Sequence, residues 1–269
     1  MRISQSSLVL AIVLALSMIA PATRAQGVDP EFRERIAGHD TVPADVQWAF
    51  QQSLLSTSIY TPQAQHILEP PPVDGQGDVT VATATGNVTN VGGQFVPGFI
   101  TNNQTTDYVW ISAGTELKDK IGVWHGDLSG LKLRVREILG LRPESVDDYV
   151  VTMTVQDADL FRPTPDPTTS TKWSTGNAPL PPTDFPTVPS TAPSWYVLWF
   201  ANNMLFSYRP PGYPWTHLGY TYDWRPGIAD HYGVSEYVIK DGANVINYQV
   251  QTIAQYFNLA QGANALAGN

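Results

Sequence analysis

Val79-Thr80-Val81-Ala82-Thr83-Ala84-Thr85 alternates valine or alanine with threonine, and this stretch decides the fold class. Period-two alternation rich in β-branched residues predicts a β-strand. Gly86-Asn87 comes next, and glycine in the first position of a two-residue turn favours a type II′ hairpin. We therefore expect a hairpin whose second strand is Val88 to Val91.

Further strands and helices are predicted on both sides of this hairpin, and they are segregated rather than strictly alternating. The resulting prediction is an α+β fold, one compact domain with an antiparallel sheet and several short helices. Residues 195–208 fit either a helix or a strand, because their periodicity does not decide between the two. The other expected strands are 108–112, 149–155, 235–240 and 244–250, and the expected helices are 43–55, 115–121, 131–139 with Gly140 as its C-cap, and a closing helix that places 250, 253, 254 and 257 on one face.

Residues 162–193 contain nine prolines, separated mainly by serine, threonine, aspartate and glycine. Such a segment has few backbone donors and little to bury, so we expect a long surface loop. Whether this loop is an ordinary connection or a functional flap stays open. The predicted organisation is a leader at 1–25, a flexible segment at 26–40, the α+β domain at 41–261 and a flexible tail at 262–269.

The N-terminus has the features of a cleavable signal peptide. Arg2 precedes the apolar run from Leu8 to Ala20, which is too short to cross a bilayer as a helix. Small residues around Ala25 favour cleavage after that position. We expect export to the periplasm or full secretion, with no membrane span after cleavage. An uncleaved anchor is the alternative.

Composition excludes several classes of protein. The chain has no cysteine, which rules out disulfides, thiol nucleophiles and thiolate metal sites. Its formal charge is −9 and becomes more negative once Arg2 and Arg24 leave with the signal peptide. Such a protein repels phosphates and anionic bilayers, so no nucleic acid partner is expected. Solubility alone also explains this acidity.

Two segments resemble a group of uncharacterised exported bacterial proteins. The first extends from Val109 to Asp159-Leu160-Phe161-Arg162-Pro163, and the second contains Pro214-Trp215-Thr216-His217-Leu218-Gly219-Tyr220-Thr221-Tyr222-Asp223-Trp224. Similar proteins often carry cysteines after the first segment, where this chain has Thr164. The resemblance implies export and a shared fold, but no activity.

Familiar catalytic motifs are missing from the sequence. The nearest approach to a Gly-x-Ser-x-Gly elbow is 126–130, where Ser129 stands one position late. Neither a phosphate-binding loop with lysine, nor His-Glu-x-x-His, nor a dinucleotide fingerprint occurs. A serine triad with other spacing stays open, because geometry rather than sequence order defines a triad.

The C-terminal half gathers the remaining candidates, since twelve of the 29 aromatic residues lie between positions 195 and 232. A strand over 215–224 would place His217 and Asp223 on one side but about 20 Å apart, at about 3.3 Å per residue. The catalytic candidates are His217, Asp223, Asp230, His231 and Glu236, and the ligand-binding candidates are Trp215, Tyr220, Tyr222, Trp224, Arg225 and Tyr232.

Three functions compete for these residues. The leading hypothesis is a non-catalytic binding or accessory protein, whose rings stack on a small-molecule or carbohydrate ligand. The alternative is a secreted hydrolase of small esters, lactones or glycosides, with His217 or His231 as general base. In a third version, these histidines and carboxylates hold a divalent metal; otherwise no cofactor is expected. Aromatic residues also pack strand cores, and the oligomeric state stays undetermined.

Overall fold

Strands β1 (Asp78–Thr85) and β7 (Tyr149–Gln156) pair along eight residues and form the middle of the main sheet in this computed structural model. The structure describes residues 42–176, 178–179 and 187–259. The predicted leader, the flexible segment 26–40 and the tail 262–269 lie outside these residues. The description below concerns the unit that begins at Pro43.

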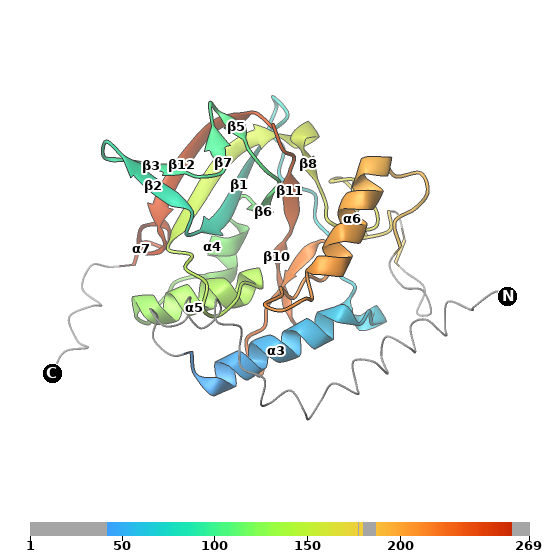
Figure 1. Ribbon diagram of the computed structural model, residues 1–269, viewed down its shortest axis with the longest axis horizontal. Coiled ribbons are helices and arrows are strands. Elements are labelled where there is room, and N and C mark those ends of the chain that lie inside the picture. Colours follow the sequence, from blue (N-terminus) through green and yellow to red (C-terminus); the bar gives the residue numbers. More distant parts are fainter. Residues whose placement is uncertain (1–41, 177, 180–186, 260–269) are drawn as a thin grey trace. The chain divides into compact units, whose positions relative to one another are not determined.

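The main sheet has six strands in the order β12-β7-β1-β6-β11-β8, and every neighbouring pair is antiparallel (Figure 1). Helices accompany it, so the predicted α+β class is confirmed. The remaining strands of this sheet are β6 (Val109–Ala113), β8 (Leu160–Phe161), β11 (Tyr237–Ile239) and β12 (Val245–Thr252); outside it lie β2 (Val88–Val91) with β3 (Gln94–Pro97), β4 (Ile100–Thr101) with β5 (Gln104–Thr105), and β9 (Tyr220–Tyr222) with β10 (Tyr232–Ser235).

The helices are short, with α3 and α6 the longest of those described. Their bounds are α3 Ala44–Ser58, α4 Glu116–Ile121, α5 Leu128–Leu139, α6 Ser194–Phe206 and α7 Ile253–Tyr256, with 3-10 turns η2 at Pro62–Ala64 and η3 at Asp157–Asp159. The side chain of Asp127 caps α5 by accepting from the Gly130 N–H at 2.7 Å, and Gly140 ends α5 in the left-handed conformation. The predicted Gly140 cap is confirmed. Residues 195–208, left open by their periodicity, are mostly helix.

Alternation along the strands separates two apolar cores. Val79 and Val81 of β1 lie in one core with Met153 of β7, whereas Ala82 packs in another with Leu131 and the rest of the α5 surface. The second face of the sheet is therefore covered by helices, and we call it the helix-covered face. Helix α6 covers the part of this face that β6, β11 and β8 form.

The predicted hairpin at 79–91 is wrong. Strand β2 pairs with β3 through the Gly92-Gly93 turn, and β1 pairs with β6 and β7. The two consecutive glycines both have positive φ, which suits a tight turn better than Gly86-Asn87 does. Strands β11 and β12, which flank Asp241-Gly242, likewise lie apart in the strand order of the sheet.

The Pro-rich segment begins inside the protein, although the sequence placed all of it at the surface. Arg162 and Thr164 have no exposed surface. The Arg162 guanidinium donates to the carbonyl groups of Glu69 and Thr169 at 2.9 Å each and to the Tyr237 hydroxyl at 3.0 Å. Residues 180–186 of this segment lie outside the described part of the chain. None of the described helices is long and apolar enough to cross a membrane.

Candidate functional site

A pocket lies on the helix-covered face, between the part covered by α5 and the part covered by α6. Its volume is about 590 Å³, and it is lined by β1 and β6 of the sheet and by the C-terminal ends of α5 and α6. The sheet contributes small side chains there, including Ala82, Ala84 and Ser112. Because α5 covers one end of the face and α6 the other, these small residues leave space between them.

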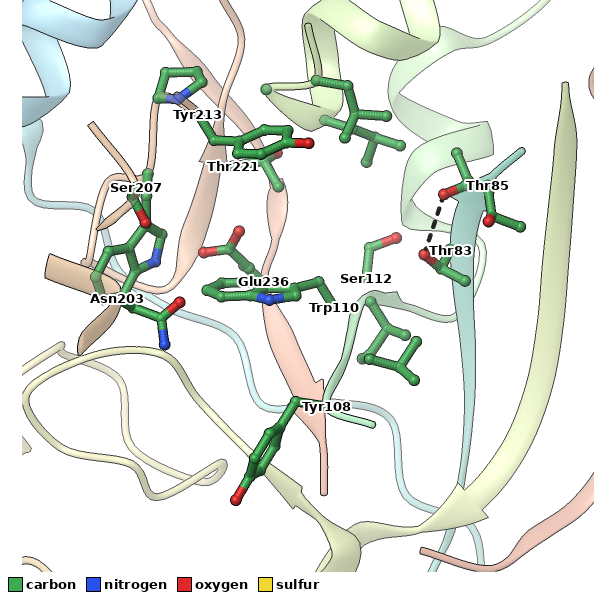
Figure 2. A pocket seen from close by; sticks show the side chains of 18 of the residues that line it. Thr83, Thr85, Tyr108, Trp110, Ser112, Asn203, Ser207, Tyr213, Thr221 and Glu236 are labelled. Carbon is green, nitrogen blue, oxygen red and sulfur yellow. Dashed lines mark hydrogen bonds between the residues drawn. The ribbon is translucent and has the colours of Figure 1, made fainter. Parts of the chain in front are cut away.

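Aromatic side chains from separate segments surround this pocket: Phe99, Tyr108, Trp110, Phe206, Tyr213 and Trp215. Phe206 is 56% exposed and Tyr213 is 43% exposed, so the pocket opens to solvent beside them. In the view of Figure 2, the rings of Tyr213 and Trp110 stand on opposite sides of the open space. A ligand that enters would therefore meet mainly ring surface.

Glu236 is the buried acid of the pocket. It is the single residue between β10 and β11, and its N–H donates to the Gly219 carbonyl at 2.9 Å. Period-two alternation sets its direction, since Val238 packs toward α6 whereas Tyr237 and Ile239 pack into the opposite core. Glu236 therefore points to the helix-covered face, and Figure 2 shows its carboxyl group directed into the pocket.

The Glu236 carboxyl group is desolvated and poorly satisfied. The residue is only 9% exposed, and its Oε2 atom has no hydrogen-bond partner among the described residues. Burial raises the pKa of Glu236 well above 4.5, the ordinary value, and the nearby Trp215 indole N–H lowers it in part. The carboxyl group thus has a neutral donor beside it but no described cation.

Behind Glu236 lies a second buried group of polar side chains. The Tyr208 hydroxyl lies 2.5 Å from the Trp215 carbonyl oxygen and 3.1 Å from Nδ1 of His217. Burial, followed by the charge of Glu236, raises the pKa of Tyr208. Burial lowers the pKa of His217 to about 4, so its imidazole is neutral at pH 7. His217 does not line the pocket.

The predicted extended strand over 215–224 is interrupted. His217 has a φ of 49° and Gly219 a φ of 87°, so a turn separates Trp215 from β9. Trp215 and Thr221 still form an isolated bridge across this turn. The even spacing assumed for His217 and Asp223 therefore does not apply, and these two side chains hydrogen-bond to different partners.

Asp223 lies in an ion-pair network rather than in the pocket. Its carboxylate accepts two hydrogen bonds from Arg134, at 2.8 and 2.5 Å, and Arg134 also donates to Glu137 at 3.1 Å. Both Asp223 and Arg134 are buried. A smaller hollow beside them is lined by Asp223, Arg225 and Asp230, so three predicted residues do meet there.

The other candidates are held by packing and by backbone contacts. His231 stacks on Tyr222 with ring centroids 4.6 Å apart, and its Nδ1 lies 2.6 Å from the Asp223 carbonyl oxygen. Tyr220 stacks on Tyr232 at 4.9 Å. The Trp224 indole is buried and donates to the Leu141 carbonyl oxygen at 2.9 Å. None of these five rings lines the larger pocket.

Of the eleven residues nominated from the sequence, the larger pocket contains Glu236 and Trp215. Sequence reasoning missed the contributions of β1, β6 and α6, including Trp110, Ser112 and Asn203. A usable signal was the position of Glu236 itself, an acid inside the otherwise strand-like run 234–239. Among the described residues, no three His, Asp or Glu side chains come together as a metal site.

No known protein family, curated protein or solved structure matches this chain. The resemblance of residues 108–240 to exported bacterial proteins therefore stays a prediction.

Proposed function

We propose that this protein binds a small organic molecule in the pocket between α5 and α6, with Glu236 as the polar anchor. One observation carries the proposal. A buried carboxyl group on which no described cation acts lines a cavity of about 590 Å³ whose other walls are largely apolar and aromatic. Ligand sites in proteins combine such a wall with few polar groups, in cavities of this size.

Burying the Glu236 carboxyl group costs free energy. A buried polar group that lacks a partner costs about 1–3 kcal/mol, and a charged group costs more. Most buried polar groups are therefore paired within the protein. Glu236 lines the cavity, and the neutral Trp215 indole N–H is the donor that acts on its carboxyl group. A bound molecule can supply the partner that the chain does not, so that binding relieves a cost already present in the folded state.

The hydrolase alternative has one observation in its favour. A carboxyl group whose pKa is raised by burial can act as a general acid near neutral pH, and Glu236 meets that condition. Among the described residues, the only other acid that lines the pocket is Asp107, which is exposed. A panel of esters, lactones and glycosides tests this alternative. Turnover by the wild type that Glu236→Gln abolishes would establish it over simple binding.

Export to the periplasm or beyond belongs to the same proposal, because a binding protein outside the cytoplasm would meet its ligand directly. Mass spectrometry of protein recovered from outside the cytoplasm tests this part. A mature N-terminus after Ala25 is the expected result, and retention of Met1 contradicts it.

Two tryptophan substitutions on α6 test the binding site. Asn203 lines the pocket and is half-buried, whereas Asn202 is exposed and does not line it. Asn203→Trp should fill the cavity and abolish binding of any small ligand detected by calorimetry, whereas Asn202→Trp should leave binding unchanged. Equal binding by both variants would move the ligand site elsewhere.

A further inference from the structure

The charges of the residues around the pocket indicate the class of its ligand. The lining contains two acids, Glu236 and Asp107, and no lysine, arginine or histidine. Two guanidinium groups flank its opening without lining it: Arg142 lies 5.3 Å from the ring centroid of Tyr213, and Arg209 lies 5.2 Å from that of Phe206. Burial and the Trp215 N–H change the pKa of Glu236, and no positive charge contributes to that change.

We infer that the ligand is an organic cation, a small ammonium ion that carries an apolar part. This inference rests on the proposed binding function and specifies its ligand class. The ammonium group would pair with the Glu236 carboxyl group, on which no described cation acts.

The walls suit such a cation as well. Aromatic rings attract ammonium groups through their negative faces, and recognition of quaternary ammonium ions uses cages of this kind. Trp110, Tyr213 and Trp215 lie around the pocket to which Glu236 contributes its carboxyl group. The negative charge of the whole chain adds a weak attraction for cations and disfavours anions.

A neutral ligand is the competing partner, because a protonated Glu236 can donate a hydrogen bond to an ether or carbonyl oxygen. The two ligand classes have opposite pH dependence. A permanent cation pairs with the ionised carboxylate, so its binding strengthens as the pH rises through the pKa of Glu236. A neutral acceptor needs the protonated acid, so its binding weakens over the same range. Tyr208, His217 and Asp107 are the other titratable groups near Glu236, and none of them carries a positive charge at pH 7.

The experiment uses three probes that share a benzyl or phenyl ring and differ in charge. Benzyltrimethylammonium, benzyl alcohol and benzoate are titrated into the full-length protein by isothermal calorimetry at pH 5 and pH 8. At pH 8, the cation should bind about tenfold tighter than the alcohol, the scale of one desolvated cation–π or ion-pair contact, and benzoate should not bind. At the lower pH, cation binding should also release protons. The release is measured as a binding enthalpy that changes with the ionisation enthalpy of the buffer.

Two variants make the test specific. Glu236→Gln keeps the shape of the side chain and should remove the preference for the cation, while benzyl alcohol binds as before. Asp107→Asn makes the same change in net charge at an exposed position of the same pocket, and it should alter the preference less than twofold, because solvent screens that charge. Thermal unfolding of each variant verifies that it is folded.

The outcomes separate the two proposals. If benzyl alcohol or benzoate binds the wild type as tightly as the cation, the pocket is a binding site but its ligand is not a cation. The same conclusion follows if the cation preference survives Glu236→Gln. If none of the three probes binds the wild type, or if a probe binds Asn203→Trp as tightly as the wild type, the proposed binding function fails together with its ligand class.

Discussion

Asp223 and Glu236 are both buried acids near the C-terminal strands, but the protein treats them in opposite ways. Asp223 accepts two hydrogen bonds from Arg134, which also donates to Glu137. Glu236 has no described cation beside it and lines an open cavity. A paired buried charge holds structure together, whereas an unpaired one next to space indicates a place for something else to bind.

The largest effect should come from neutralising the paired acid itself. Asp223→Asn leaves Arg134 buried with Glu137 as its remaining anionic partner, and breaking a buried pair costs about 3–5 kcal/mol. Urea unfolding at pH 7 measures this loss. Asp230→Asn is the control, because Asp230 is exposed and should change stability by no more than about 0.5 kcal/mol. Equal losses of unfolding free energy in the two variants would show that the ion-pair network stabilises the protein no more than an exposed carboxylate does.

His217, which lies behind Glu236, provides the next effect. Its pKa is lowered from 6.5 to about 4 by burial, so between these values the unfolded chain binds a proton that the folded protein does not. Stability should therefore fall by roughly 3 kcal/mol as the pH drops from above 6.5 to about 4, at 1.36 kcal/mol for each unit of pKa shift. His217→Gln should remove this part of the pH dependence. An unchanged slope in that variant would assign the acid sensitivity to other groups.

Much of the fold was predictable from the sequence because its signals are local. The alternation at 79–85 and 149–155 predicted the two central strands, and Gly140 marked the end of α5. The wrong hairpin arose where two turn signals competed within eight residues, and Gly92-Gly93 prevailed over Gly86-Asn87. Local pattern alone could not decide that competition.

The site was much less predictable, because long-range packing determines it. Asp223 was a catalytic candidate from the sequence. Its partner Arg134 is 89 residues earlier in the chain, and no pattern near Asp223 predicts that the two residues pair. The cavity exists because small residues of β1 and β6 lie between helices that cover opposite ends of one face. Glu236 and Trp215 were nominated, but the strands and helix ends around them were not.

The unpaired acid should respond in the opposite direction to the paired one. The pKa of Glu236 is raised in the folded protein, so the folded state binds the proton more tightly, and stability is lost as the pH rises from about 4.5 through the raised pKa. Glu236→Gln should therefore stabilise the protein by about 1–3 kcal/mol at a pH above that pKa and by nothing at pH 4. Thermal unfolding at pH 4 and pH 9 measures both values. A variant destabilised at both would place Glu236 among the structural acids, beside Asp223.

The smallest effect on stability should accompany the filled pocket. Asn203→Trp changes a half-buried position near the end of α6 and should alter the unfolding free energy by no more than about 0.5 kcal/mol, because its new ring enters space that is already empty. Equilibrium unfolding beside Asn202→Trp gives this comparison. A loss of several kcal/mol in Asn203→Trp alone would indicate that the space is too narrow to accept a ring, and so too narrow for the proposed ligand.

The most direct measurement is a titration of the Glu236 carboxyl carbon by NMR in protein labelled with ¹³C at glutamate, with the signal assigned by its absence in Glu236→Gln. We expect the titration midpoint of Glu236 to lie well above pH 4.5 in the ligand-free protein. Saturating benzyltrimethylammonium should lower this midpoint. A midpoint at or below 4.5 without ligand would mean that the carboxylate already has its partners, and the pocket would lose its anchor.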